Sequence, residues 1–349
     1  MKEYSIGPLT GSLKPKFKRI SIALGEDFNP EHGVDFFFDL NTLVSTLMTS
    51  QKFLLKLPFA EEDAVVMDMI ESILSILHHW KIYSRNISDK RFFFLFNDFE
   101  ICALAEQPIV KSYLAPYTKK IGGEKYNQLR YFWNEAIKRI EIILKYVPQS
   151  YFIRCDRFDS YVIPQLMWNY NEKERHRVII TGNPFFTNYI YMKNTHVIYS
   201  RYGKNGMNQL DDPLMIVQAI SRIDEDVMGT FIKNKVFYNL LSAIIGNFDR
   251  GIIGLTQLGL SSFAIDLLRS IEKYEIPNDP SSIESVLPAV KPTFHSYLRQ
   301  VYPLVDIESH AALVTPSMLE KIKSTMVDMY DIDGLSKLQA GDLNLIDLL

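Results

Sequence analysis

Two aspartates follow apolar runs that have the length and composition of buried strands. Asp39 lies near the end of GVDFFFDLN (residues 33–41), and Asp98 ends RFFFLFND (residues 91–98). Carboxylates that converge from neighbouring strand ends can bind a hard divalent cation, which prefers oxygen ligands. The alternative is that each aspartate caps a following helix or forms a turn. The first interpretation predicts a metal site, and the second predicts only local structure.

Residues 111–139 combine positive charge with aromatic side chains. They hold seven basic and two acidic residues, a local charge of +5, whereas the whole chain carries −3. Cations neutralise phosphates and aromatic rings stack on unpaired bases, so this mixture favours single-stranded nucleic acid. The predicted contacts are Lys111, Tyr117, Lys119, Lys120, Lys125 and Arg130, and the other aromatic residues are Tyr113, Tyr126, Tyr131, Phe132 and Trp133. The alternative is an amphipathic helix with a solvated basic face.

A glycine-rich stretch separates two apolar helical patterns in residues 243–271. Glycines let backbone amides approach a phosphate, and the N-terminus of a following helix adds a favourable dipole. Gly254 and Gly259 would supply this backbone, while Ser261 and Ser262 would cap the second helix or donate to phosphate. The alternative is an ordinary helical hairpin with a glycine-rich turn.

Strand-like and helical patterns alternate along the first two thirds of the chain. This alternation predicts an α/β fold with a mainly parallel central sheet flanked by helices. In such sheets ligands bind beyond the carboxyl ends of the strands, where Asp39, Asp98 and Asn183 fall. From about residue 213 the pattern is helical, and the proline-containing residues 276–292 are predicted to link the main body to a helical C-terminal segment.

Composition narrows the class of protein. The chain has 349 residues, of which 47% are hydrophobic, enough for a sizeable core. The net charge of −3 gives no general attraction to nucleic acid, so such binding requires local patches. Cys102 and Cys155 are too few for a disulfide framework, which indicates an intracellular setting. Without a signal-like start or an apolar run of about 18 residues, a cytoplasmic protein without membrane contact is expected.

Taken in order, these segments resemble the 5′-nuclease superfamily, which includes flap endonucleases and bacteriophage 5′–3′ exonucleases. YLAPYTKKIGGEKY is similar to the start of the phage enzymes' helical arch, and IIGNFDRGIIGLTQLGLSSFAIDLL is similar to the family's helix–three-turn–helix, which grips duplex DNA. The resemblance covers residues 33–275. The divisions that we expect are an irregular segment (1–32), a nuclease-like α/β domain (33–212) with an arch (104–145), a helix–three-turn–helix region (213–275) and a helical extension (276–349).

The resemblance implies a magnesium site built from carboxylates. Asp39 and Asp98 match the family's first two acids. In FIRCDRFDSYV, Asp159 matches one acid of the next cluster, and Asp156 takes that place if the chain shifts by a residue. These matches would hold one Mg²⁺.

The site that the resemblance implies is partly degenerate. Arg157 stands where a glutamate is expected, and Asn183 and Phe185 replace both acids of a TGDxD motif. In the glycine-rich stretch Asn247 replaces another acid, while Asp249 matches the remaining one. An amide oxygen ligates a cation without adding charge, so we expect one metal ion or none.

The implied function is structure-specific binding of 5′-ended or branched DNA, with slow magnesium-dependent 5′–3′ exonuclease or flap endonuclease activity. The alternative is a catalytically inactive scaffold or DNA-binding accessory protein in a replication or virion assembly. The C-terminal GDLNLIDLL is similar in character to tails that dock on sliding clamps. The other reading of this tail is a final helical turn packed on the body.

Overall fold

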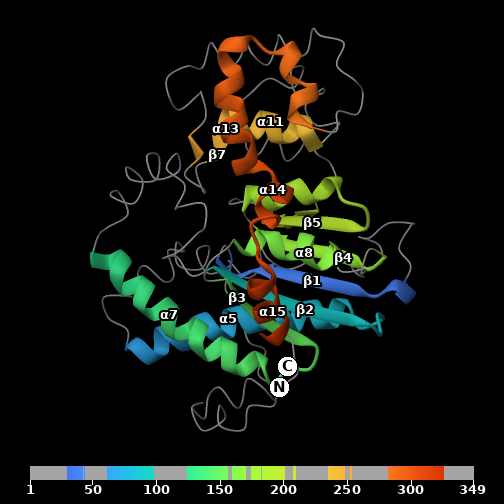
Figure 1. Cartoon of the computed structure of the whole chain (residues 1–349). Helices are drawn as coiled ribbons and strands as arrows, with labels where there is room; N and C mark the ends of the chain where they lie inside the picture. Colours follow the sequence, from blue (N-terminus) through green and yellow to red (C-terminus); the bar gives the residue numbers. More distant parts are fainter. Residues whose placement is uncertain are drawn as a thin grey trace.

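The computed structural model of the chain is built around a six-stranded β-sheet (Figure 1). It describes residues 30–41, 43, 61–97, 124–155, 159–169, 174–181, 183–200, 207–209, 235–247, 252–253 and 282–325. The strands are β1 (Val34–Asp39), β2 (Lys90–Asn97), β3 (Ser150–Cys155), β4 (His176–Thr181), β5 (Thr195–Ser200) and β6 (Met207–Gln209). Their order is β3-β2-β1-β4-β5-β6, and only β6 runs antiparallel to its neighbour. The predicted α/β fold with a mainly parallel sheet is confirmed.

Helices cover both faces of the sheet. One face packs against α5 (Glu62–Tyr83) and α7 (Glu124–Leu144). The other face packs against α8 (Ile163–Asn169), α11 (Lys235–Ile245), α13 (His295–Val305) and α14 (Ile307–Ala311), and α15 (Pro316–Thr325) lies beside β3. None of the helices in the described ranges is long and apolar enough to cross a membrane.

Stacked phenylalanines join β1 to β2 on both faces of the sheet. The register places Phe36 beside Phe92, and their ring centroids are 5.0 Å apart. On the opposite face Phe37 stacks on Phe93, again at 5.0 Å. Successive side chains of a strand point to opposite faces, so a strand that is buried on both faces needs an unbroken apolar run. The FFF of each strand meets this need.

The predicted linker (276–292) is described from residue 282 onward, and this part contributes side chains to the core. Residues 282–294 form three short 3-10 helices, η5 (Ile283–Ser285), η6 (Leu287–Ala289) and η7 (Pro292–Phe294). Val286, Leu287 and Val290 are buried in the same apolar cluster as the sheet and α13. Pro288 and Pro292 lie in the first turns of η6 and η7, where the fixed φ of proline suits the start of a helix.

The first half of the glycine-rich stretch contains a short β-pair on either side of residues 248–251, which lie outside the described residues. After α11, β7 (Gly246–Asn247) pairs antiparallel with β8 (Ile252–Ile253). A short β-pair satisfies backbone groups that an open turn would leave to solvent. The second predicted helix lies outside the described residues.

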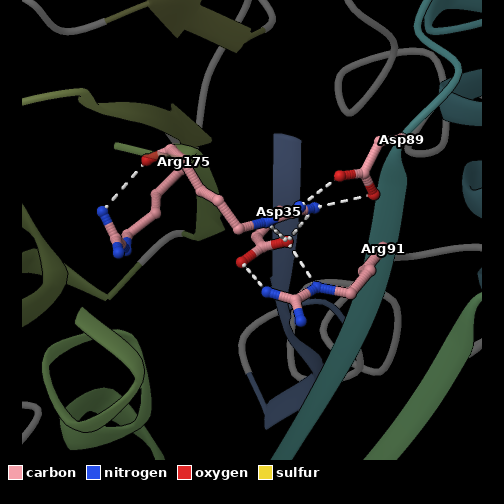
Figure 2. A network of polar contacts seen from close by, with 5 residues as sticks. Asp35, Asp89, Arg91 and Arg175 are labelled. Carbon is pink, nitrogen blue, oxygen red and sulfur yellow. Dashed lines mark hydrogen bonds and ion pairs between the residues drawn. The ribbon is translucent and has the colours of Figure 1, made fainter. Parts of the chain in front are cut away.

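Figure 2 shows a network of ion pairs at the amino edge, the end of the sheet where the parallel strands begin. Asp35 on β1 accepts hydrogen bonds from Arg91 on β2 at 2.8 and 2.7 Å, and from Arg175 at 3.0 Å. Arg175 also pairs with Asp89, just before β2. Asp35 is fully buried, and a buried carboxylate requires such compensation. The network therefore stabilises the fold at the edge opposite to the predicted site.

Candidate metal and nucleic-acid site at the carboxyl edge of the sheet

Asp39 lies at the carboxyl edge, which is the end of the sheet where the parallel strands β1 to β4 finish. Its side chain is buried, and Oδ2 accepts a hydrogen bond of 2.8 Å from Thr181 Oγ1 on the neighbouring strand β4. Thr181 Oγ1 in turn accepts from the backbone N–H of Asn183 at 2.8 Å. The Thr181 hydroxyl therefore orients the Asp39 carboxylate toward β4, and the backbone N–H of Asn183 fixes that hydroxyl in turn.

Asp159 lies beyond the end of β3, on the other side of β2. It is the N-cap residue of the 3-10 helix η2 (Ser160–Val162), yet its carboxylate makes no cap hydrogen bond. Asn97, the last residue of β2, approaches it instead, with Nδ2 3.5 Å from Asp159 Oδ1. Asn97 Oδ1 also accepts a hydrogen bond of 2.6 Å from the backbone N–H of Ser160. Asp159 is thereby fixed next to the end of β2.

The two aspartates flank the position at which β2 ends. Because β2 separates β1 from β3, those strands are about 10 Å apart, two strand spacings. Asp98 is the next residue in the sequence after Asn97, with which β2 ends, and it lies outside the described residues. Among the described residues, no three acidic, histidine or cysteine side chains form a group that could hold a metal ion.

His310 is a neighbour of the site that the sequence did not indicate. It lies on α14, where its ring packs against Tyr161 of η2 with centroids 5.2 Å apart. Burial lowers the pKa of His310, and the nearby Asp159 carboxylate partly opposes that effect. No spacing pattern links a histidine to an aspartate 151 residues earlier, so only the fold could reveal this pair.

The described part of the basic segment corrects one expectation. Phe132 and Trp133 are only 5% exposed and belong to the apolar cluster between α7 and α5, so they cannot stack on bases. Tyr131 is 52% exposed. Lys138 pairs with Glu135 at 2.6 Å. From residue 131 onward α7 is thus the amphipathic helix of the alternative interpretation.

The other predicted site residues fall partly on described elements and mostly outside them. Lys125 and Arg130 lie on the first two turns of α7, and Asn247 lies in β7. Outside the described residues are Asp98, Lys111, Tyr117, Lys119, Lys120, Asp156, Arg157, Asp249, Gly254, Gly259, Ser261, Ser262 and the C-terminal tail. Of the predicted metal ligands, the structure describes Asp39 and Asp159, and it places them on either side of β2.

Carboxylate and amide oxygens are the ligands that Mg²⁺ uses in proteins, usually one or two carboxylates with several waters. Asp39 ends β1, Asp159 precedes η2 and Asn183 follows β4. These described side chains do not by themselves complete a metal site.

Comparisons with known proteins add the following. No model of a known protein family matches the chain, and no curated protein matches it in sequence.

Three solved structures of the bacteriophage T5 5′-exonuclease, also called a flap endonuclease, are similar in fold. The first, with metal ions, has 13% identity and a TM-score of 0.46, and covers 90% of this chain and 99% of its own. The second, with zinc, has 12% identity, a TM-score of 0.47 and the same coverage. The third, a variant with DNA and metal ions, has 11% identity, a TM-score of 0.48, and covers 90% of this chain and 98% of its own.

Proposed function

We propose that this chain binds branched or 5′-ended DNA at the carboxyl edge of the sheet and hydrolyses it slowly with one divalent ion. The observation that carries the proposal is that Asp39 and Asp159 flank the end of β2, from which Asp98 follows. Three carboxylates around one strand end would suit Mg²⁺. The resemblance of the sequence to the 5′-nucleases gives the substrate class.

In this proposal Thr181, Asn97 and Asn183 each have a role at the site. Thr181 holds the Asp39 carboxylate toward β4, and Asn97 holds the segment that carries Asp159. Asn183 offers an amide oxygen where an acid would be needed for a second ion. A bound Mg²⁺ supplies an activated water and polarises the phosphate. We expect slow hydrolysis of DNA, because one ion would do the work of the two that the resembled family uses.

Two segments of the sequence would hold the DNA. Cationic side chains of the arch would neutralise phosphates, and Tyr117 would stack on an unpaired base. In the glycine-rich stretch, backbone amides around Gly254 and Gly259 and the hydroxyls of Ser261 and Ser262 would approach the duplex phosphates. The proposed cationic contacts are Lys111, Lys119, Lys120, Lys125 and Arg130.

A 5′-labelled flap substrate tests the proposal directly. With Mg²⁺ or Mn²⁺ the chain should bind the flap and release a labelled product slowly. The Asp98→Ala variant should still bind the flap but yield no product. If the chain neither binds the flap nor cleaves it, the proposal is wrong.

The second candidate function is an inactive DNA-binding accessory protein or scaffold. It is favoured by Asn183 and Arg157, which replace acids of the resembled family at the site. An arginine beside the acids would repel a metal ion and would bind a phosphate as a fixed cation. Tight flap binding, with no product above that of Asp98→Ala, would identify this function.

A further inference from the structure

Three histidine side chains, which we name the histidine row, lie side by side at the amino edge of the sheet. His32 of η1 (Pro30–His32) stacks on His176 at the start of β4, with ring centroids 6.4 Å apart and ring planes inclined by 20°. His176 also stacks on His196 of β5, at 6.1 Å and 25°. The row therefore spans the segment that leads into β1 and then β4 and β5, which follow β1 in the sheet.

Two backbone hydrogen bonds join the same three segments. The N–H of His176 donates to the carbonyl of Gly33, just before β1, at 3.1 Å. The N–H of Arg177 donates to the carbonyl of Asn194, just before β5, at 2.8 Å. The imidazole rings and the backbone thus hold the amino ends of β1, β4 and β5 together at one place.

The surroundings of His176 disfavour a positive charge on its ring. Its side chain is buried, and the nearby His196, His32 and Arg177 all oppose its protonation. Glu174 faces the outer end of the row, where its carboxylate lies 3.7 Å from His32 Nε2 and is largely exposed to solvent. This carboxylate favours a proton on the outermost ring. A proton there disfavours a second proton on the central ring, because like charges repel.

The buried acid of the amino edge points away from the row. Val34 pairs with His176 in the register of β1 and β4, and Asp35, the next residue of β1, points to the opposite face of the sheet. Arg91 and Arg175 bind Asp35 there, and Arg175 also binds Asp89. The carboxylates of this ion network are therefore engaged with guanidinium groups on the other face.

We propose that the histidine row is an acid-operated clasp, which joins the amino ends of β1, β4 and β5 while its rings are neutral and releases them locally in acid. Opening the clasp exposes His176 to water, where the ring takes up a proton at its ordinary pKa of 6.5, whereas in the closed form that pKa is about 4. The clasp is therefore complete above the ordinary pKa and weakens as the pH falls toward 4. This inference does not depend on the proposed function.

Hydrogen exchange of the full chain, measured by mass spectrometry and corrected for the intrinsic rate at each pH, tests the clasp. From about pH 7.5 to about pH 5, the amides of His176 and Arg177 should exchange about tenfold faster or more, because the proton favours their open state. Phe92 is the internal control. Its N–H donates to the Gln149 carbonyl at 2.8 Å at the same edge, between strands that carry no member of the row. Its corrected rate should change much less.

Three variants assign the acid response to the row. His176→Gln should abolish it, because glutamine does not titrate, and His196→Gln should weaken it, because a neighbouring cation is lost. His295→Gln should leave it unchanged, since His295 bonds to the Val290 carbonyl at 2.8 Å, outside the row.

Equal acceleration of Phe92 in acid would mean that the whole sheet loosens, and it would overturn the clasp. A full response in His176→Gln, or its loss in His295→Gln, would do the same. Should His176→Gln fail to fold, His196→Gln decides the matter, because an undiminished response in that variant contradicts the proposal.

Discussion

Carboxylates at the two edges of the sheet have different kinds of partner. At the carboxyl edge, Thr181 donates a neutral hydroxyl to Asp39, which orients the carboxylate without cancelling its charge. At the amino edge, the guanidinium groups of Arg91 and Arg175 bind Asp35 and neutralise it. The second arrangement is a structural ion network.

Replacement of Asp35 tests the structural role of the amino edge. Asp35→Asn removes the buried negative charge that Arg91 and Arg175 share, while Arg175 keeps its pair with Asp89. We expect a loss of about 3–5 kcal/mol in the free energy of unfolding, measured by urea denaturation. The control is Glu284→Gln, which removes the exposed ion pair with Arg299 and should cost at most about 1 kcal/mol. Similar losses in both variants would contradict this assignment.

His176 makes the free energy of unfolding depend on pH. Burial, with the nearby His196 and His32, lowers its pKa to about 4, and Arg177 acts in the same direction. The folded state therefore keeps His176 neutral, whereas the unfolded chain takes up a proton below its ordinary pKa of 6.5. This part of the stability is complete above that pKa and is lost as the pH falls toward 4.

The effect of His176 should be measurable in urea unfolding. Between about pH 7.5 and about pH 5, His176 should account for a loss of about 2 kcal/mol in the free energy of unfolding. His176→Gln should remove this part of the pH dependence, because glutamine does not titrate. An unchanged difference between the two pH values would mean that His176 is already protonated in the fold.

For the helix α7, the sequence predicts the helix itself but not which of its faces is buried. Its helical character was predictable because apolar residues recur at helical spacing. Charges and aromatic rings also alternate there, and the sequence alone could not tell which rings face solvent. In the structure Phe132, Ala136 and Ile140 lie four residues apart on the face that packs against α5.

The strand ends were more predictable than the helix faces. The carboxyl ends of parallel strands share one edge, so Asp39 was expected there from its position after an apolar run. The roles of Thr181 and Asn97 depend on strand order, which a single sequence does not specify. His310 comes from a distant helix and needed the complete tertiary packing.

At the scale of the whole molecule, residues 282–325 complete the core on one face of the sheet. Leu298 of α13 is fully buried in the cluster that also contains Phe37 and Val286. Removing such a side chain loses apolar burial and leaves a cavity. We therefore expect α13 to contribute to the stability of the fold.

A pair of leucines tests this dependence. Leu298→Ala should lower the free energy of unfolding by about 2–5 kcal/mol in urea denaturation. Leu313→Ala makes the same chemical change at a side chain that is 48% exposed, and it should cost at most about 0.5 kcal/mol. Equal costs would contradict the view that α13 belongs to the main core.

Charge reversal tests the proposed path of the DNA. Lys119→Glu with Lys120→Glu should weaken flap binding and flatten its salt dependence, since fewer counter-ions are released. We expect the slope of log Kd against log salt to fall by about 2. Lys138→Glu is the control, because Lys138 already pairs with Glu135, and its slope should change less. An unchanged slope in the double variant would remove the segment from the DNA path.

A crystal structure of the chain soaked in Mn²⁺ tests the central claim most directly, because the anomalous signal locates each ion. The account predicts one Mn²⁺ at the carboxyl edge, ligated by Asp39, Asp98 and Asp159, with Asn97 bound to Ser160 beside it. An ion elsewhere, or Asp98 pointing away from the other two aspartates, would contradict it.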